Sequence, residues 1–205
     1  MHRHTIRRAV IAGLALTMTA LSLTMSSSTA GAARPLLRAT LLDQNGTEVG
    51  HVVFKGRGTK VSRVQVHLDA GAAAFGTSDF HGFHIHTVGS CDPTPVGTPP
   101  AVFGSAGGHW NPTGATHGAH AGDMPSLLVH ANGKADAEFD TDRFEVSELL
   151  DANGSAVVLH AGRDNFANIP ATYSSGEPPV AGPNTSTNNT GDAGGRYACG
   201  VVVAA

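Results

Sequence analysis

The sequence predicts an all-β protein, an antiparallel sandwich or barrel of about eight short strands. Two observations lead to this prediction. Apolar residues alternate with polar ones in short runs, as where Val64, Val66 and Leu68 are separated by single polar residues, which is typical of a strand with one buried face. No long segment carries the apolar period of an amphipathic helix. The fold is therefore expected to rest on strands and turns.

Eight runs are expected to form the strands. In chain order they are Leu36–Leu42, Val49–Lys55, Val61–Leu68, Phe83–Thr87, Ser126–Ala131, Ala135–Phe139, Ala156–His160 and Tyr197–Val203. Three Asn-Gly pairs lie between such runs, and Asn-Gly supplies the positive backbone angles that a tight hairpin needs. Phe144–Leu150 is expected to form a brief helical turn. Two long segments, 89–125 and 165–195, interrupt the strands, and loops of this length are usually functional or disordered.

Residues 1–33 have the pattern of an export signal that is removed. Three arginines give a positive start, an apolar run extends over residues 9–25, and small residues follow at 30–32. A permanent membrane anchor is the alternative, which the hydroxyl residues within the apolar run disfavour. We expect a mature domain over residues 34–205, without a membrane anchor, that is secreted or retained in the cell envelope.

Charge and cysteine content limit the possible partners of the protein and the possible roles of its cysteines. Removal of the leader takes away three of 13 basic residues and none of the 16 acidic ones. The mature net charge of about −6 argues against nucleic acid and anionic lipid as partners. Cys91 and Cys199 are the two cysteines, and in an exported protein a single disulfide is the natural interpretation. Two free thiols or a thiolate metal site are the alternatives.

Histidine spacing indicates a metal centre. His84 and His86 are two residues apart in an expected strand, so both side chains point to one face. With His109 and His160 they form a set of imidazoles suited to copper. Three nitrogens and one oxygen suited to tetrahedral zinc come from His109, His117, His120 and Asp123. Because an imidazole has two nitrogens, His109 is expected to bridge the two metals.

Five motifs resemble those of one family. They read GFHIH at 82–86, GSC at 89–91, GGHWNP at 107–112, GD at 122–123 and GDAGGRYACG at 191–200. From Leu36 onward the chain resembles the copper/zinc superoxide dismutases, exported bacterial type. The resemblance implies an eight-stranded Greek-key β-barrel with one copper and one zinc ion per chain. It implies an oxidoreductase that converts superoxide to oxygen and hydrogen peroxide by alternate reduction and reoxidation of copper.

The resemblance also assigns roles to residues of this sequence. The copper ligands would be His84, His86, His109 and His160. The zinc ligands would be His109, His117, His120 and Asp123. His109 and Arg196 would be the catalytic residues. His109 would bridge the metals, while Arg196 would dock the superoxide anion beside copper through its fixed donors.

Supporting roles follow from the same resemblance. Asp164 would accept hydrogen bonds from His84 and His117, and such partners fix the orientation of ligand rings. His81 would support the strand that carries the first copper ligands. A disulfide between the two cysteines would tie the loop that follows this strand to the last strand, and so hold Arg196 in register.

Two departures from the family pattern shape our expectations. His117 and His120 are three residues apart, whereas the family has a longer segment there, so the loop must be rebuilt to direct both rings to one zinc ion. Segment 165–195 contains two charged residues, Glu177 and Asp192, where family members often place lysines and glutamates that steer superoxide. We therefore expect the rate to depend less on ionic strength than in a lysine-guided relative.

Two other functions compete with this prediction. A secreted copper-binding or metal-buffering protein would keep the same barrel, but storage requires neither Arg196 nor Asp164 nor a bridging His109. A zinc hydrolase would need an open metal position with a nearby carboxylate base, and the sequence contains no His-Glu-x-x-His segment. The sequence leaves open whether the protein forms a homodimer.

Overall fold

The described residues belong to one compact unit, Ala33–Ala205. The computed structural model describes residues 36–205 apart from 59, 70–74, 94–100, 171–173 and 176–179. The predicted export signal, residues 1–33, lies outside the described residues. No helix among the described residues is long and apolar enough to cross a membrane.

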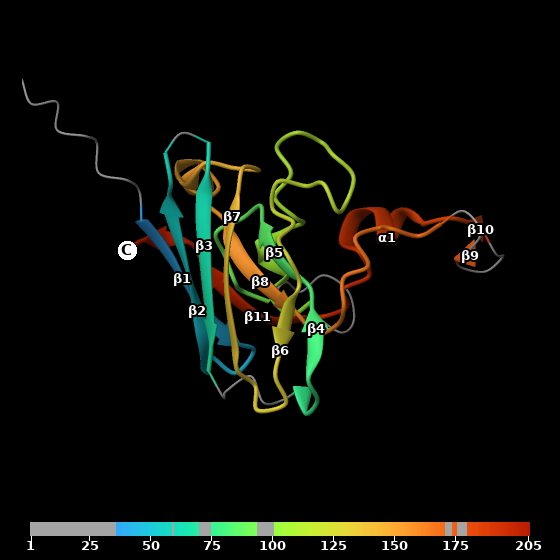
Figure 1. Cartoon of the computed structure of the whole chain (residues 1–205), viewed down its shortest axis with the longest axis horizontal. Coiled ribbons are helices and arrows are strands. Elements are labelled where there is room, and N and C mark those ends of the chain that lie inside the picture. The colour runs from blue at the N-terminus through green and yellow to red at the C-terminus, as the bar shows by residue number, and fades with distance from the viewer. Residues whose placement is uncertain (1–35, 59, 70–74, 94–100, 171–173, 176–179) are drawn as a thin grey trace, which may run out of the picture. The chain divides into compact units, whose positions relative to one another are not determined.

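Antiparallel strands make up most of the unit, which confirms the predicted all-β Greek-key fold (Figure 1). The main path through the sheet is β5 (Phe83–His86), β8 (Ala156–His160), β11 (Arg196–Val201), β1 (Leu36–Asp43), β2 (Glu48–Gly56), β3 (Ser62–Leu68) and β7 (Ala135–Thr141). The eighth strand, β12 (Val203–Ala204), pairs with β1. Strand β3 pairs with β7 and strand β5 pairs with β8, so strands that are neighbours in the sheet are joined by long connections. Such connections between antiparallel neighbours are typical of a Greek key.

Shorter elements complete the described part. Two small sheets pair β4 (Asp79–His81) with β6 (Leu127–Val129) and β9 (Ser174–Ser175) with β10 (Val180–Ala181). Two 3-10 helices span Gly104–Ala106 and Val146–Leu150. Helix α1 (Thr185–Thr190) begins after Asn184, whose side chain accepts a hydrogen bond from the backbone N–H of Thr187.

All eight predicted runs contain strands, with ends that differ by a few residues. The last run divides at Val202, whose N–H donates to the carbonyl of Ser155, the residue before β8, at 2.9 Å. The helical turn predicted at Phe144–Leu150 forms as a 3-10 helix. Strands β4, β9 and β10 and helix α1 were not predicted from the sequence, because segments of two to six residues are too short to show a period.

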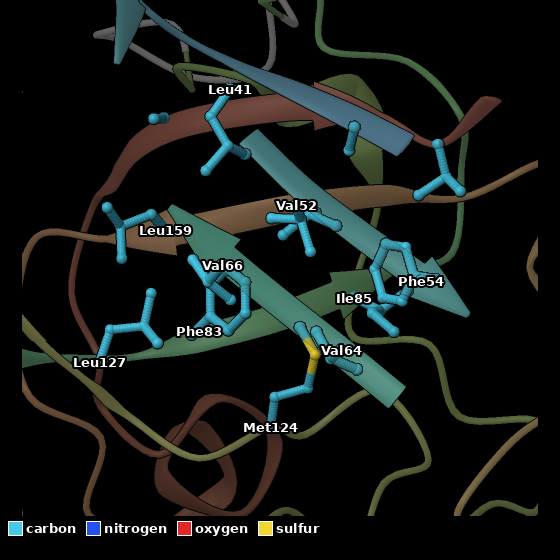
Figure 2. Close-up of a cluster of buried hydrophobic side chains, with 14 of the residues drawn as sticks. Leu41, Val52, Phe54, Val64, Val66, Phe83, Ile85, Met124, Leu127 and Leu159 are labelled. Carbon is cyan, nitrogen blue, oxygen red and sulfur yellow. The ribbon is translucent and has the colours of Figure 1, made fainter. Parts of the chain in front are cut away.

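The apolar core fills the space between two walls of the sheet. Figure 2 shows Val52 and Val64, from β2 and β3, pointing toward Phe83 and Ile85 from β5. These four side chains are fully buried, and burial of such side chains contributes about 1.5–3 kcal/mol each to stability. Alternate residues of β2, β3 and β7 face outward and carry most of the polar groups of these strands.

Strand β5 is buried at every position, because a loop lies along its outer edge. The Trp110 N–H donates to the Ile85 carbonyl at 2.7 Å, and the Ile85 N–H donates to the Gly122 carbonyl at 2.9 Å. A Cβ on Gly122 would approach the Ile85 carbonyl to 2.5 Å, so this approach requires glycine. The loop therefore continues the sheet and places its own polar residues next to those of β5.

Cys91 and Cys199 form a disulfide, which confirms the single-bridge interpretation over free thiols or a thiolate metal site. Their Cα atoms lie 5.8 Å apart and 108 residues separate them in sequence. The bridge joins the loop after β5 to β11, and closing a loop of this length contributes about 4–5 kcal/mol in the chain-entropy model. It thus anchors one end of the long segment 89–125.

Candidate metal centre

Four buried histidines meet beside β5. His84 and His86 project from the same face of the strand, His109 comes from the loop along its edge, and His160 ends β8. Each of the four offers a ring nitrogen within 4.8 Å of the others. Their relative exposure is 0 to 9%. The residues predicted to hold copper are therefore brought together; we refer to them as the four-histidine group.

Three of these rings present a nitrogen that has no hydrogen-bond partner among the described residues: His84 Nδ1, His86 Nε2 and His160 Nε2. The other nitrogen of each ring is engaged. His86 Nδ1 lies 2.9 Å from the Gly107 carbonyl and His160 Nδ1 lies 3.2 Å from the Gly194 carbonyl. A carbonyl can only accept, so Nδ1 carries the proton and Nε2 presents a lone pair. Buried unpaired nitrogens are costly, and a bound cation would satisfy them.

Burial keeps these rings neutral. It lowers the pKa of His84 to about 4 and that of His160 to about 3, and it holds the pKa of His86 well below its ordinary value. The charged form of an imidazole is disfavoured when the ring leaves water. Since a metal binds the neutral imidazole, the rings are ready to act as ligands at neutral pH.

A second group lies against the first and shares His109 with it. The donor atoms of His109, His117, His120 and Asp123 all lie within 4.8 Å of one another, and all four residues are buried. Asp123 Oδ1 is 2.9 Å from His109 Nδ1 and 3.3 Å from His120 Nδ1, while Oδ2 is 3.3 Å from His117 Nδ1. Three nitrogens and a carboxylate match a tetrahedral zinc site. We call these residues the His₃Asp group.

The charges of the His₃Asp group are arranged for a cation. Burial by itself would raise the pKa of Asp123, but its contacts with His109 and His117 hold it well below the usual range. Burial would also lower the pKa of His117, yet hydrogen bonds to Asp123 and Asp164 raise it to about 9. Without metal, a proton on His117 offsets one of the two carboxylate charges. A divalent cation would replace that proton and leave the ring neutral.

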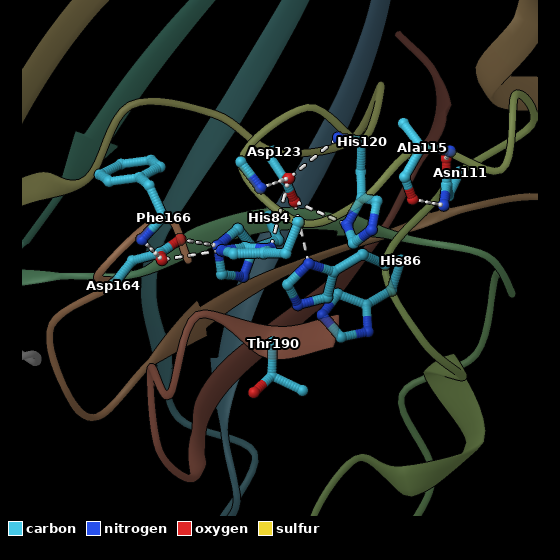
Figure 3. A network of polar contacts seen from close by, with 12 residues as sticks. His84, His86, Asn111, Ala115, His120, Asp123, Asp164, Phe166 and Thr190 are labelled. Atoms are coloured by element: carbon cyan, nitrogen blue, oxygen red, sulfur yellow. Dashed lines mark hydrogen bonds and ion pairs between the residues drawn. The ribbon is translucent and has the colours of Figure 1, made fainter. Parts of the chain in front are cut away.

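Asp164 joins the two groups (Figure 3). Its Oδ2 lies 2.7 Å from His84 Nε2 and its Oδ1 lies 2.8 Å from His117 Nε2. The side chain of Asp164 has no exposed surface. One carboxylate therefore fixes a ring of each group, and in both rings it leaves Nδ1 to face the metal position.

Arg196 stands at the entrance to the four-histidine group. It begins β11 opposite His160, and its guanidinium donates to the carbonyls of Phe103 and Gly107. Together with His86, His109 and His160 it lines a cavity of about 510 Å³. The lining of this cavity thus combines the Arg196 cation with three of the predicted copper ligands, and it also includes the carboxylate of Asp192.

A family model for copper/zinc superoxide dismutase matches residues 48–202. The chain belongs to the copper/zinc superoxide dismutase family. The superoxide dismutase [Cu-Zn] of Mycolicibacterium paratuberculosis is 38% identical over 180 residues, which cover 86% of this chain and 78% of that protein. The one from Deinococcus radiodurans is 33% identical over 195 residues, 89% of this chain and 91% of the relative.

Solved structures show the same fold. A Cu/Zn superoxide dismutase from Brucella abortus aligns with a TM-score of 0.58 and 26% identity, covering 81% of this chain and 98% of that one. A superoxide dismutase-like protein from Bacillus subtilis aligns with a TM-score of 0.59 and 26% identity, over 81% and 97%. The predicted family and barrel are confirmed, and copper and zinc are the metals that this family uses.

His81 lies behind the four-histidine group of this dismutase-family site. Its Nδ1 is 3.0 Å from the carbonyl of His160, so it supports the backbone of a predicted copper ligand. Its ring packs on Phe75 with centroids 3.8 Å apart, and Phe75 packs on Tyr197. Burial lowers the pKa of His81. The structure thus places His81 beside the centre and outside both groups of metal-binding atoms.

Two residues of this dismutase-family site had no role predicted from the sequence. Arg143 donates to three carbonyls of the loop that carries His117 and His120. Gly191 packs so closely on the Asp164 bridge that a Cβ there would lie 1.9 Å from Asp164 Oδ1. Arg143 showed no signal in the sequence, because carbonyl acceptors carry no residue identity. Gly191 was part of a motif but had no assigned role.

Proposed function

We propose that this chain is a copper/zinc superoxide dismutase whose copper is held by the four-histidine group and whose zinc is held by the His₃Asp group. The copper ligands are then His84, His86, His109 and His160. The zinc ligands are His109, His117, His120 and Asp123. One observation carries the assignment: three buried, unpaired imidazole nitrogens converge with His109, whose ring contributes to both groups. Such an arrangement is costly unless a cation occupies it.

Bound copper would supply the one-electron chemistry by which two superoxide anions and two protons become oxygen and hydrogen peroxide. Arg196 binds and orients the anion. Its positive charge lies on the wall of the cavity that His86, His109 and His160 also line. The carbonyls of Phe103 and Gly107 hold the guanidinium in place, so little reorganisation is needed when the anion arrives.

His109 is suited to hold and move a proton. Its Nδ1 lies 2.9 Å from Asp123 within the His₃Asp group, which leaves Nε2 to face the four-histidine group. A proton at His109 Nε2 would sit beside the anion cavity, where it can be delivered to the reduced product. Asp123 and Asp164 keep the rings oriented during this exchange. The ligand histidines are buried, so bulk water has little access to their rings.

We further propose that residues 1–33 direct export and that the enzyme acts outside the cytoplasm. The arginines, apolar run and small residues at the start of the chain support this assignment. Homologous enzymes from bacteria such as Deinococcus radiodurans match over most of the chain. Mass determination of protein recovered from the envelope or the medium measures the cleavage site, which we expect near residue 32 or 33. Recovery of the uncleaved chain from the cytoplasm alone would contradict the assignment.

Superoxide decay by stopped flow tests the function. Mature protein loaded with copper should catalyse fast decay, and zinc should increase the rate. His160→Ala should lower the rate by more than about 100-fold, since it removes a proposed copper ligand. His51→Ala is the matched control, because that ring lies on the outer face of the sheet, and it should leave the rate unchanged. Copper-loaded protein that is no faster than metal-free protein would instead indicate a metal-buffering protein.

A further inference from the structure

The loop that carries His117 and His120 is folded around a carboxylate. Asp123 Oδ2 accepts hydrogen bonds from the backbone N–H of Gly118 at 2.7 Å and of His120 at 3.0 Å. Gly118 has a φ of +85°, and a Cβ there would lie 2.6 Å from the Phe166 carbonyl, so this tight turn depends on glycine. The N–H groups of the loop therefore turn inward to a zinc-binding residue.

The carbonyls of the same loop turn outward to Arg143. One guanidinium nitrogen donates to His120 O at 3.0 Å and to Asp123 O at 3.2 Å, and the second donates to Gly118 O at 3.0 Å. Arg143 follows β7 and lies 20 to 25 residues from these acceptors in sequence. Only arginine has donors spread in a rigid plane that can reach three carbonyls at once.

This contact explains how a short loop builds the His₃Asp group. His117 and His120 are three residues apart in sequence. Their ring centroids lie 5.4 Å apart, and both Nδ1 atoms lie 3.3 Å from a carboxylate oxygen of Asp123. A loop with few residues has few internal contacts to hold that geometry. The Asp123 carboxylate holds it from inside and the Arg143 guanidinium from outside.

We propose that Arg143 is a positioning residue for zinc, whose guanidinium closes the loop of residues 117–123 so that His117, His120 and Asp123 converge on one ion. The proposal rests on the zinc assignment of the proposed function. It deepens that assignment by naming a residue that controls zinc affinity without touching the metal. Arg143 donates to no residue of the four-histidine group. Its loss should therefore release zinc selectively and leave copper in place.

Chelator competition on the fully loaded enzyme tests the proposal. Arg143→Met keeps the apolar stem and removes every donor, and we expect it to weaken zinc binding by about 10- to 100-fold, the range seen when supports of metal ligands are removed. Arg143→Lys keeps the charge but loses the planar fork, so an intermediate loss is expected. Copper content should remain unchanged in both variants. Arg38→Met is the matched control, since among the described residues its guanidinium makes only a surface ion pair, with Glu48 at 4.0 Å.

A second readout separates positioning from general support. Co²⁺ bound in place of zinc has a visible spectrum that reports tetrahedral coordination, and Arg143→Met should change that spectrum while the melting temperature of the metal-free protein stays close to the parent value. Zinc affinity within twofold of the parent would overturn the proposal. Equal loss of zinc and copper with a lower melting temperature would also overturn it, because Arg143 would then support the barrel. If the parent itself bound no zinc, the zinc assignment would fail first.

Discussion

Two histidines of this chain each lie between two carboxylates, one inside the metal centre and one on the outer face of the sheet. His117 has Asp164 at 2.8 Å and Asp123 at 3.3 Å from its two nitrogens. His67, on β3, has Asp136 at 2.7 Å and Asp69 at 3.2 Å. The side chain of His117 is fully buried, whereas that of His67 is 43% exposed.

The difference shows that local residue chemistry does not by itself make a metal site. Around His117 further donors converge, so that groups of three or more metal-binding side chains form there and, among the described residues, only in that centre. Around His67 no such donors converge among the described residues; its side chain is partly exposed to solvent and contacts the His51 ring. Burial makes the unmet charge inside the centre costly, while solvent screens the outer pair. A cation is needed in one place and not in the other.

Acid should produce the largest difference between the two regions. In the metal-free protein, burial keeps the pKa of His84 at about 4 and of His160 at about 3, whereas the unfolded chain takes up these protons near pH 6.5. Their stabilising contribution is present above pH 6.5 and lost as the pH falls through the folded pKa values. We expect the free energy of unfolding to fall by up to about 1.4 kcal/mol per pH unit for each ring.

Denaturant unfolding of the metal-free protein at about pH 6.5, 5.5 and 4.5 measures this slope. His67→Gln is the control for the outer face. Its pKa is raised, chiefly by the hydrogen bond to Asp136, so it contributes no loss in this range and the variant should keep the slope. An unfolding free energy that stays constant from pH 6.5 to 4.5 would refute the expected role of the buried rings.

Replacing one carboxylate in each region sharpens the comparison. Asp164→Asn removes one of the two acceptor oxygens that orient His84 and His117, and we expect copper or zinc affinity to fall by about 10- to 100-fold. Asp136→Asn makes the corresponding change beside His67, and metal affinity should change by less than about twofold. Chelator competition measures both variants. A similar loss from the two variants would show that burial of the carboxylate is not what matters.

Gly191→Ala should disturb the contact between Asp164 and His117 by steric overlap alone. A Cβ at this position would lie 1.9 Å from Asp164 Oδ1 and 2.2 Å from His117 Nε2, and φ is +60°. We expect a loss of about 1–3 kcal/mol in stability, as for overpacked cores, together with weaker zinc binding. Gly195→Ala is the matched control, since nothing lies within 4 Å of its Cβ position. Thermal unfolding and zinc content measure the two variants; equal stability would contradict the prediction.

The smallest effect on stability is expected for His67 and its two carboxylates on the outer face of the sheet. The raised pKa of His67 means that its ion pairs with Asp136 and Asp69 stabilise the fold fully below pH 6.5 and lose that effect as the pH rises through the folded pKa. His67→Gln should therefore lower the melting temperature at about pH 5.5, by less than about 2 °C because exposed pairs contribute little. The difference should vanish at about pH 9.5. A greater loss at the higher pH would reverse the expected sign.

Much of the fold and the metal centre could be predicted from the sequence. Strand runs and their turns were found because apolar alternation leaves a period, and the glycine of each Asn-Gly pair, at 46, 133 and 154, has a positive φ. The histidines predicted as ligands do converge, since side chains two apart in β5 share a face and His160 ends the strand beside it. The short strands β4, β9 and β10, helix α1 and the position of Arg143 could not be predicted.

Sequence alone determined which side chains are available for metal binding, because imidazoles, carboxylates and their spacing along a strand are chemical facts of the chain. The tertiary structure decided which ring nitrogen faces the metal position and what holds it there. The Gly107 carbonyl lies 21 residues from His86 and the Gly194 carbonyl lies 34 residues from His160, and Arg143 lies 23 residues from His120. Such contacts form only when folding excludes water from a shared interior, where every buried polar atom must find a partner.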